Sequence, residues 1–72
     1  MEFVKVEYWR NRTVLIDGQE AGTTNRVLLV GEGRHRFELS PPKNYVPETQ
    51  VRVVRDTTRA RPLVIGFLHE SQ

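Results

Sequence analysis

The residues best suited to contacting another molecule lie near the start of the chain. Trp9 is the only tryptophan, and Arg10 and Arg12 follow it closely. An indole ring can stack on a nucleic-acid base while neighbouring guanidinium groups hold phosphates. Tryptophan and arginine are equally typical of the energetic centre of a protein interface. Residues 9–12 are therefore a candidate interaction site, for a protein or for a nucleic acid.

A second group of arginines occurs in the last third of the chain. Arg52, Arg55, Arg59 and Arg61 are accompanied by a single acidic residue, Asp56. Such a stretch can contact phosphate or an acidic partner. It is also typical of a solvated loop that keeps a strand edge from pairing. The possible interaction residues are therefore Trp9, Arg10, Arg12, Arg55, Arg59 and Arg61.

The two histidines, His35 and His69, are the residues closest to a catalytic or metal-binding type. Imidazole titrates near neutral pH and ligates metals. No serine, aspartate or second histidine stands at an obvious partnering distance in the sequence from His35, and two histidines lack the further ligands of a usual zinc site. We expect His35 to pack in the core or at its rim, and His69 to be a solvated strand end. The sequence predicts no catalytic residue, no metal site and no cofactor.

Composition argues against an enzyme. The chain has 72 residues and no cysteine, and a β-domain of this size has little room for a deep pocket. No nucleophile elbow or paired carboxylates are present, and residues 31–33 (Gly-Glu-Gly) are too short for a dinucleotide-binding loop. The sequence therefore predicts a protein that is not an enzyme.

Charge and hydropathy set limits on partners and location. The 11 basic and 9 acidic residues give a net charge of +2, and the signs are interspersed, whereas nucleic-acid binders usually gather basic residues on one face. No apolar run is long enough to predict a membrane span, and no secretory signal peptide is visible. We expect a cytoplasmic location if the chain is complete. The location is open if the chain is a domain of a larger exported protein.

The elements that must position these residues are short β-strands. In residues 3–9 polar and apolar side chains alternate, which indicates a strand with one buried face. Val4, Val6 and Tyr8 fall on that face, so Trp9 falls on the polar one. Further strands are predicted at residues 13–16, 26–30, 34–40, 49–54 and 63–68, with a return strand around Gly22.

Three of these segments carry more specific predictions. The nearly all-apolar segment 26–30 predicts a central strand. In segment 49–54 we expect Val51 and Val53 to point inward and Arg52 outward. The apolar segment 63–68 predicts a last strand that is buried on both faces or lies over the core.

The turns are equally well marked. Asp17-Gly18 is typical of a tight hairpin because both residues tolerate a positive φ. Residues 41–42, both proline, must end the preceding strand, and Asn44 can take a left-handed conformation. The pattern predicts one all-β domain spanning residues 1–72, a small sandwich or open barrel of six to seven strands.

Residues 14–54 resemble the PEGA domain family. The matching positions are Val14 to Gly18, Gly22 to Thr24, Val27, Leu29, Gly33, His35, Phe37, Leu39, Tyr45, Val51 and Val53. The tetrapeptide that names the family is absent at residues 9–12, and Asn25 and Asn44 replace its proline and glycine. The resemblance implies a small antiparallel β-sandwich of six to seven strands, PEGA-like and immunoglobulin-like in size. It also implies an accessory module of bacterial or archaeal proteins with no catalytic residues.

Two functions follow as expectations. The first is a non-catalytic structural or protein-interaction module that contacts a protein partner, or a second copy of itself, through an edge strand or through residues 9–12. The alternative is binding of single-stranded nucleic acid or an anionic surface by a basic, OB-like barrel. A stacking platform needs several aromatic residues on one exposed face, and the six aromatic residues of this chain are spread along its length.

Overall fold

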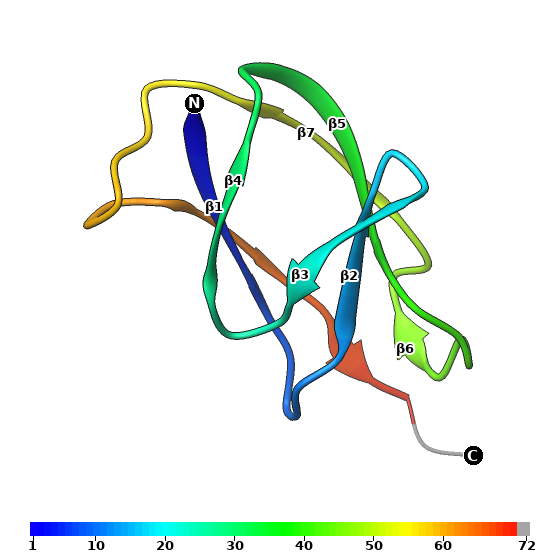
Figure 1. Cartoon of the computed structure of the whole chain (residues 1–72). Coiled ribbons are helices and arrows are strands. Elements are labelled where there is room, and N and C mark those ends of the chain that lie inside the picture. The colour runs from blue at the N-terminus through cyan, green and yellow to red at the C-terminus, as the bar shows by residue number, and fades with distance from the viewer. Residues whose placement is uncertain (71–72) are drawn as a thin grey trace.

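The computed structural model describes residues 1–70, in which all regular secondary structure is β-strand (Figure 1). The strands are β1 (Glu2–Glu7), β2 (Thr13–Ile16), β3 (Gln19–Thr23), β4 (Val27–Val30), β5 (Gly33–Leu39), β6 (Tyr45–Val46), β7 (Gln50–Val54), β8 (Leu63–Gly66) and β9 (Leu68–His69). They form a three-stranded sheet β4-β1-β8, a four-stranded sheet β3-β2-β5-β7 and a pair β6-β9. The prediction of a small all-β sandwich is confirmed.

The strand pairing departs from a purely antiparallel sheet at one place. β8 runs parallel to β1, whereas every other described pairing is antiparallel. The loop of residues 55–62 returns the chain to the start of β1, where the Thr57 hydroxyl accepts the Phe3 N–H (2.7 Å) and the Thr57 N–H donates to Glu2 Oε1 (2.9 Å). β8 therefore begins at the same end of the sheet as β1 and runs in the same direction. The pair β6-β9 adds two very short strands to the predicted seven.

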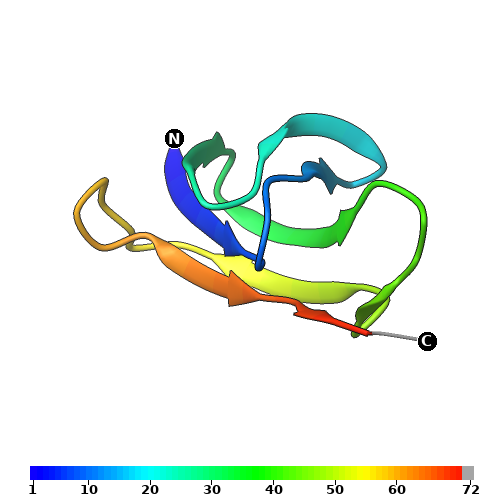
Figure 2. The same cartoon turned by 90° about the horizontal axis from the view of Figure 1, so that it is seen from below.

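The core lies between the two larger sheets, which curve around it (Figure 2). β1 contributes Val4 and Val6, and Tyr8 follows on the same face. All three are buried, while the Trp9 side chain remains 57% exposed. The predicted alternation of residues 3–9 is therefore confirmed. The remaining core residues are Val14, Ile16, Leu28, Val30, Phe37, Leu39, Tyr45, Val54, Ile65 and Phe67.

The orientation predicted for β7 is wrong. Val51 and Val53 are 55% and 53% exposed, and Arg52 is partly buried. In the register with β5, Arg52 lies opposite His35, and residues directly opposite each other share a face of the sheet. His35 lies on the core-facing side, so Arg52 does too, and the same alternation buries Val54 completely. Because three valines flank Arg52, the alternation in this segment is compatible with either face of β7 pointing toward the core.

Two further strand predictions are also corrected. The segment 26–30 is not central, because β4 lies at the edge of its sheet and β1 occupies the middle. Leu29 is accordingly 51% exposed. Of the two placements predicted for residues 63–68, burial on both faces is wrong, because Val64 on β8 is exposed. The other placement, over the core, is confirmed by the buried Ile65. An apolar strand in this protein is therefore no evidence of burial on both faces.

The turns agree with the sequence-based predictions more closely than the strands do. Asp17 and Gly18 both have positive φ (54° and 85°) and join β2 to β3, as expected of a tight hairpin. β5 ends at Leu39, just before the two prolines. Asn44 does not use the left-handed conformation open to it, whereas Asn25 does, with φ of 67°. A proline could not adopt that angle.

Candidate interaction site

The turn that carries Trp9 is held in place by the buried Thr24. The Thr24 hydroxyl donates to the Arg10 carbonyl (2.8 Å) and accepts the Arg12 N–H (2.9 Å). The Thr24 N–H also donates to the Arg12 carbonyl (2.8 Å). Thr24 has no exposed surface, so its side of these part-buried bonds is shielded from water. The turn after β1 is therefore fixed by the link between β3 and β4.

The neighbouring Asn25 fixes the end of β1. Its N–H donates to the Val6 carbonyl (2.7 Å), and its side-chain Oδ1 accepts the Tyr8 N–H (3.1 Å). The left-handed backbone at Asn25 lets one residue make both contacts. Tyr8 is thereby held with its ring in the core, and Trp9, the next residue, is directed to the surface.

Trp9 is exposed but not isolated. The Arg10 guanidinium carbon lies 3.8 Å from the centroid of the indole ring, a distance typical of a cation–π contact. The His69 ring lies 4.9 Å from it, tilted by 49°. These contacts restrict the indole, so less conformational entropy remains to be lost when a partner binds.

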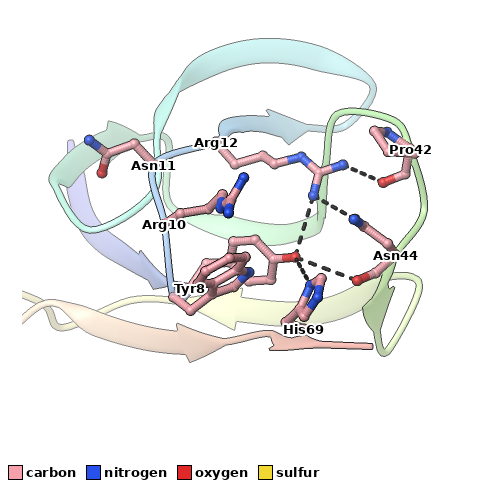
Figure 3. A pocket seen from close by; sticks show the side chains of 8 residues that line it. Tyr8, Arg10, Asn11, Arg12, Pro42, Asn44 and His69 are labelled. Atoms are coloured by element: carbon pink, nitrogen blue, oxygen red, sulfur yellow. Dashed lines mark hydrogen bonds between the residues drawn. The ribbon is translucent and has the colours of Figure 1, made fainter. Parts of the chain in front are cut away.

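Arg12 joins three separate parts of the chain (Figure 3). Its Nη1 donates to Asn44 Oδ1 (2.7 Å) and to the Tyr8 hydroxyl (3.4 Å), and its Nη2 donates to the Pro42 carbonyl. The Tyr8 hydroxyl in turn lies 3.3 Å from His69 Nδ1. The turn after β1, the loop between β5 and β6, and β9 are thus tied together at one end of the molecule.

Two hollows flank this cluster. The first has a volume of about 460 Å³ and is lined by Tyr8, Trp9, Arg10, Asn11, Arg12, Pro42, Asn44 and His69. The second has a volume of about 380 Å³ and is lined by Glu7, Tyr8, Trp9, Asn25, Gly66, Phe67, Leu68 and His69. Both share Tyr8, Trp9 and His69. We call the first the cationic hollow and the second the apolar hollow.

The structure separates the two groups of predicted interaction residues. Trp9, Arg10 and Arg12 line one hollow together. Arg55, Arg59 and Arg61 lie in the loop 55–62, near the opposite end of β1 (Figure 1). There the Arg59 guanidinium carbon lies 5.2 Å from the centroid of the Phe3 ring. These two groups of arginines therefore do not form one continuous basic surface.

Sequence reasoning missed three contributors to the site. Pro42, Asn44 and His69 reach it from later parts of the chain through the β6-β9 pair. His69 is exposed, as predicted of a strand end, but it also packs on Trp9. Strands of only two residues leave no alternating pattern in the sequence. Nothing in the local sequence therefore indicated that these residues lie beside Trp9.

His35 has a partner that the sequence did not indicate. It lies at the rim of the core, as expected, with Nδ1 2.6 Å from Asp17 Oδ2 and Nε2 2.7 Å from the Gly31 carbonyl. Both neighbours are acceptors, so only a doubly protonated ring satisfies both. The bond to Asp17, opposed by partial burial and aided by Gly31, raises the pKa of His35. The Arg36 N–H and then His35 lower the pKa of Asp17.

This pair predicts a pH-dependent contribution to stability. The charged His35 stabilises the fold fully below its unfolded pKa of about 6.5, and that contribution is lost as the pH rises through the raised folded pKa. The Asp17 contribution is present above about 3.8 and is lost as the pH falls through its lowered folded pKa. Urea unfolding should therefore show a decline in stability above about pH 6.5 that His35→Gln abolishes. An equal decline in both proteins would contradict the assignment.

The chain matches no family model, no curated protein and no solved structure. The described part of the chain has no helix with the length and apolar character to cross a membrane. Within residues 1–70, no three histidine or acidic side chains are grouped closely enough to hold a metal ion.

Proposed function

We propose that this domain is a non-catalytic protein-interaction module, and that it contacts its partner through Trp9 and the residues around it. The observation that supports this most is the exposed but restrained indole of Trp9. The large apolar side chain of Trp9 is 57% exposed, so much of it contacts water in the free domain. Burying this surface in a complex is favourable because it removes apolar area from water. Restrained tryptophan and arginine side chains are characteristic of interface hot spots.

The neighbouring surface supports the same proposal. Leu68 is exposed on β9 and lines the apolar hollow together with Trp9, so it extends the apolar area around Trp9. A polar network of Tyr8, Arg12 and Asn44 borders that area on the side of the cationic hollow. An apolar centre with a polar rim is the usual arrangement of a protein interface. Accessory modules with this arrangement act by contact, and we assign this domain to that class.

Binding of single-stranded nucleic acid is the second candidate, and the observation in its favour is that the exposed Trp9 lines one hollow together with Arg10 and Arg12. Three observations weigh against it. The Arg10 guanidinium already lies over the indole. Four of the six aromatic residues are buried: Tyr8, Phe37, Tyr45 and Phe67. Arg55, Arg59 and Arg61 lie in the loop at the other end of β1, so they do not continue the cationic surface of Arg10 and Arg12 into a track for a phosphate backbone.

The proposal is tested by quantitative partner capture from the native host, with the chain as bait. Trp9→Ala should reduce recovery of specific partners more than about tenfold, as expected of a hot-spot residue. Leu29→Ala is the matched control, because Leu29 is similarly exposed on β4, away from the site. Retention of all partners by Trp9→Ala, or equal loss from both variants, would contradict the proposal. Dependence on an edge strand instead would favour strand pairing, including a homodimer.

A further inference from the structure

The cationic hollow contains positive charge without a matching negative charge. Within residues 1–70 the ion pairs are His35–Asp17, Arg36–Glu38 and Lys43–Glu38. None includes Arg10 or Arg12, and no carboxylate lines this hollow. Two guanidinium groups on one concave surface repel each other unless an anion joins them. The positive charge of Arg10 and Arg12 is therefore not balanced by an acidic side chain within the cationic hollow.

The two arginines differ in how firmly they are placed. Arg12 is anchored by Asn44, Tyr8 and Pro42, yet its guanidinium has more N–H donors than these contacts use. Arg10 lies on the indole and makes no hydrogen bond to a described acceptor through its guanidinium. Planar guanidinium groups bind carboxylates through paired, parallel hydrogen bonds. The hollow is thus suited to a carboxylate.

The apolar hollow offers a different chemistry immediately beside it. Its lining includes Phe67 and the exposed Leu68, and Glu7 is its only acidic residue. The two hollows meet at Tyr8, Trp9 and His69. A ligand that crosses this boundary would place an anion on one side of Trp9 and an apolar group on the other. Glu7 would repel a second anion in the apolar hollow.

We infer that the site recognises a short protein segment in which an acidic side chain enters the cationic hollow and a neighbouring apolar side chain enters the apolar hollow. This inference rests on the proposed function and narrows it to an acidic–apolar class of partner. A protein segment fits better than a polynucleotide, because its charge is local and alternates with apolar groups. A continuous phosphate backbone would meet Glu7, and no arginine or lysine lines the apolar hollow to offset that charge.

The inference is tested with three probes and the intrinsic fluorescence of Trp9, the only tryptophan. The probes are a short capped peptide of glutamate and leucine, the same peptide with glutamine in place of glutamate, and a single-stranded oligothymidine. We expect the glutamate peptide to shift the Trp9 emission. The glutamine peptide should bind at least about tenfold more weakly, because it lacks the charge-assisted hydrogen bonds. Added salt should weaken the glutamate complex.

Two matched variants locate the binding. Arg10→Gln should weaken the glutamate peptide about tenfold, and Arg34→Gln, the same charge change at an exposed position on β5, should leave it unchanged. Four outcomes would overturn the inference: equal binding of both peptides, equal effects of both variants, tighter binding of oligothymidine, or no peptide binding up to about 1 mM. Partner capture that depends on Trp9 would stand in each case, so the broader proposal is tested separately.

Discussion

Replacing Thr24 with valine is expected to lower the free energy of unfolding by about 2–4 kcal/mol and to loosen the turn that carries Trp9. The substitution keeps the shape of the side chain but removes its hydroxyl. The Arg12 N–H and the Arg10 carbonyl then lose the hydroxyl of a buried side chain as their partner. Each unsatisfied buried group costs about 1–3 kcal/mol, and because both bonds are only partly buried we expect their sum to lie in the lower part of the resulting range. A domain of 72 residues commonly has a total of about 4–11 kcal/mol, so the loss is a large fraction.

Urea unfolding monitored by circular dichroism measures the stability change, and Trp9 fluorescence anisotropy measures the loosening of the turn. Thr13→Val is the matched control, because Thr13 lies on β2 and its side chain makes no hydrogen bond to another described residue. We expect the control to change stability by less than about 0.5 kcal/mol. Equal effects of the two variants, or unchanged Trp9 mobility in Thr24→Val, would show that Thr24 does not organise the site.

Replacing Tyr45 with phenylalanine is expected to cost about 1–3 kcal/mol. Tyr45 is only 1% exposed, and its hydroxyl donates to the Leu39 carbonyl (2.7 Å) and accepts the Leu39 N–H (3.2 Å). The ring also packs edge-to-face on Phe67, with centroids 5.4 Å apart. The variant retains this packing and leaves the end of β5 without its partner.

Tyr8→Phe provides the comparison for this prediction. The Tyr8 hydroxyl has longer contacts, 3.3 Å to His69 Nδ1 and 3.4 Å from Arg12 Nη1. Its removal should cost less than about 1 kcal/mol. Urea midpoints of both variants at one pH measure the difference. A larger loss in Tyr8→Phe than in Tyr45→Phe would mean that the hydroxyl of Tyr45 does not stabilise the connection from β5 to β6.

The fold was predictable wherever local chemistry decides structure. Alternation in residues 3–9 placed Tyr8 inside and Trp9 outside. The Asp17-Gly18 pair marked its hairpin because few other residue pairs adopt two positive φ angles. These signals depend on a residue and its immediate neighbours, which a single sequence contains. The sandwich class follows from many such signals in succession.

Features decided by distant parts of the chain were not predictable in this way. The face that Val51 and Val53 present depends on the register of β7 against β5. The edge position of β4 depends on β8 returning beside β1. Hydropathy is similar for a central and an edge strand when both are rich in valine and leucine, so strand order remained open.

The candidate site likewise combines residues that the local sequence indicated with residues that only long-range strand pairing brings in. Trp9, Arg10 and Arg12 are close in sequence, and their types alone suggested contact with a partner. Asn44 and His69 join them only because β6 pairs with β9. The Asp17 partner of His35 was missed for the same reason, since it comes from the hairpin turn after β2. Long-range pairing, rather than residue type, was the missing information.

Site-specific photo-crosslinking tests most directly whether the domain works by contact through the Trp9 surface. A photoreactive benzoyl-phenylalanine is placed at residue 9, and separately at residue 29 on β4 and at residue 59 in the far loop. The chain is then irradiated in its native host. We predict that position 9 crosslinks to a discrete partner and that positions 29 and 59 do not. Crosslinks from position 29 or 59 with none from position 9 would contradict the account.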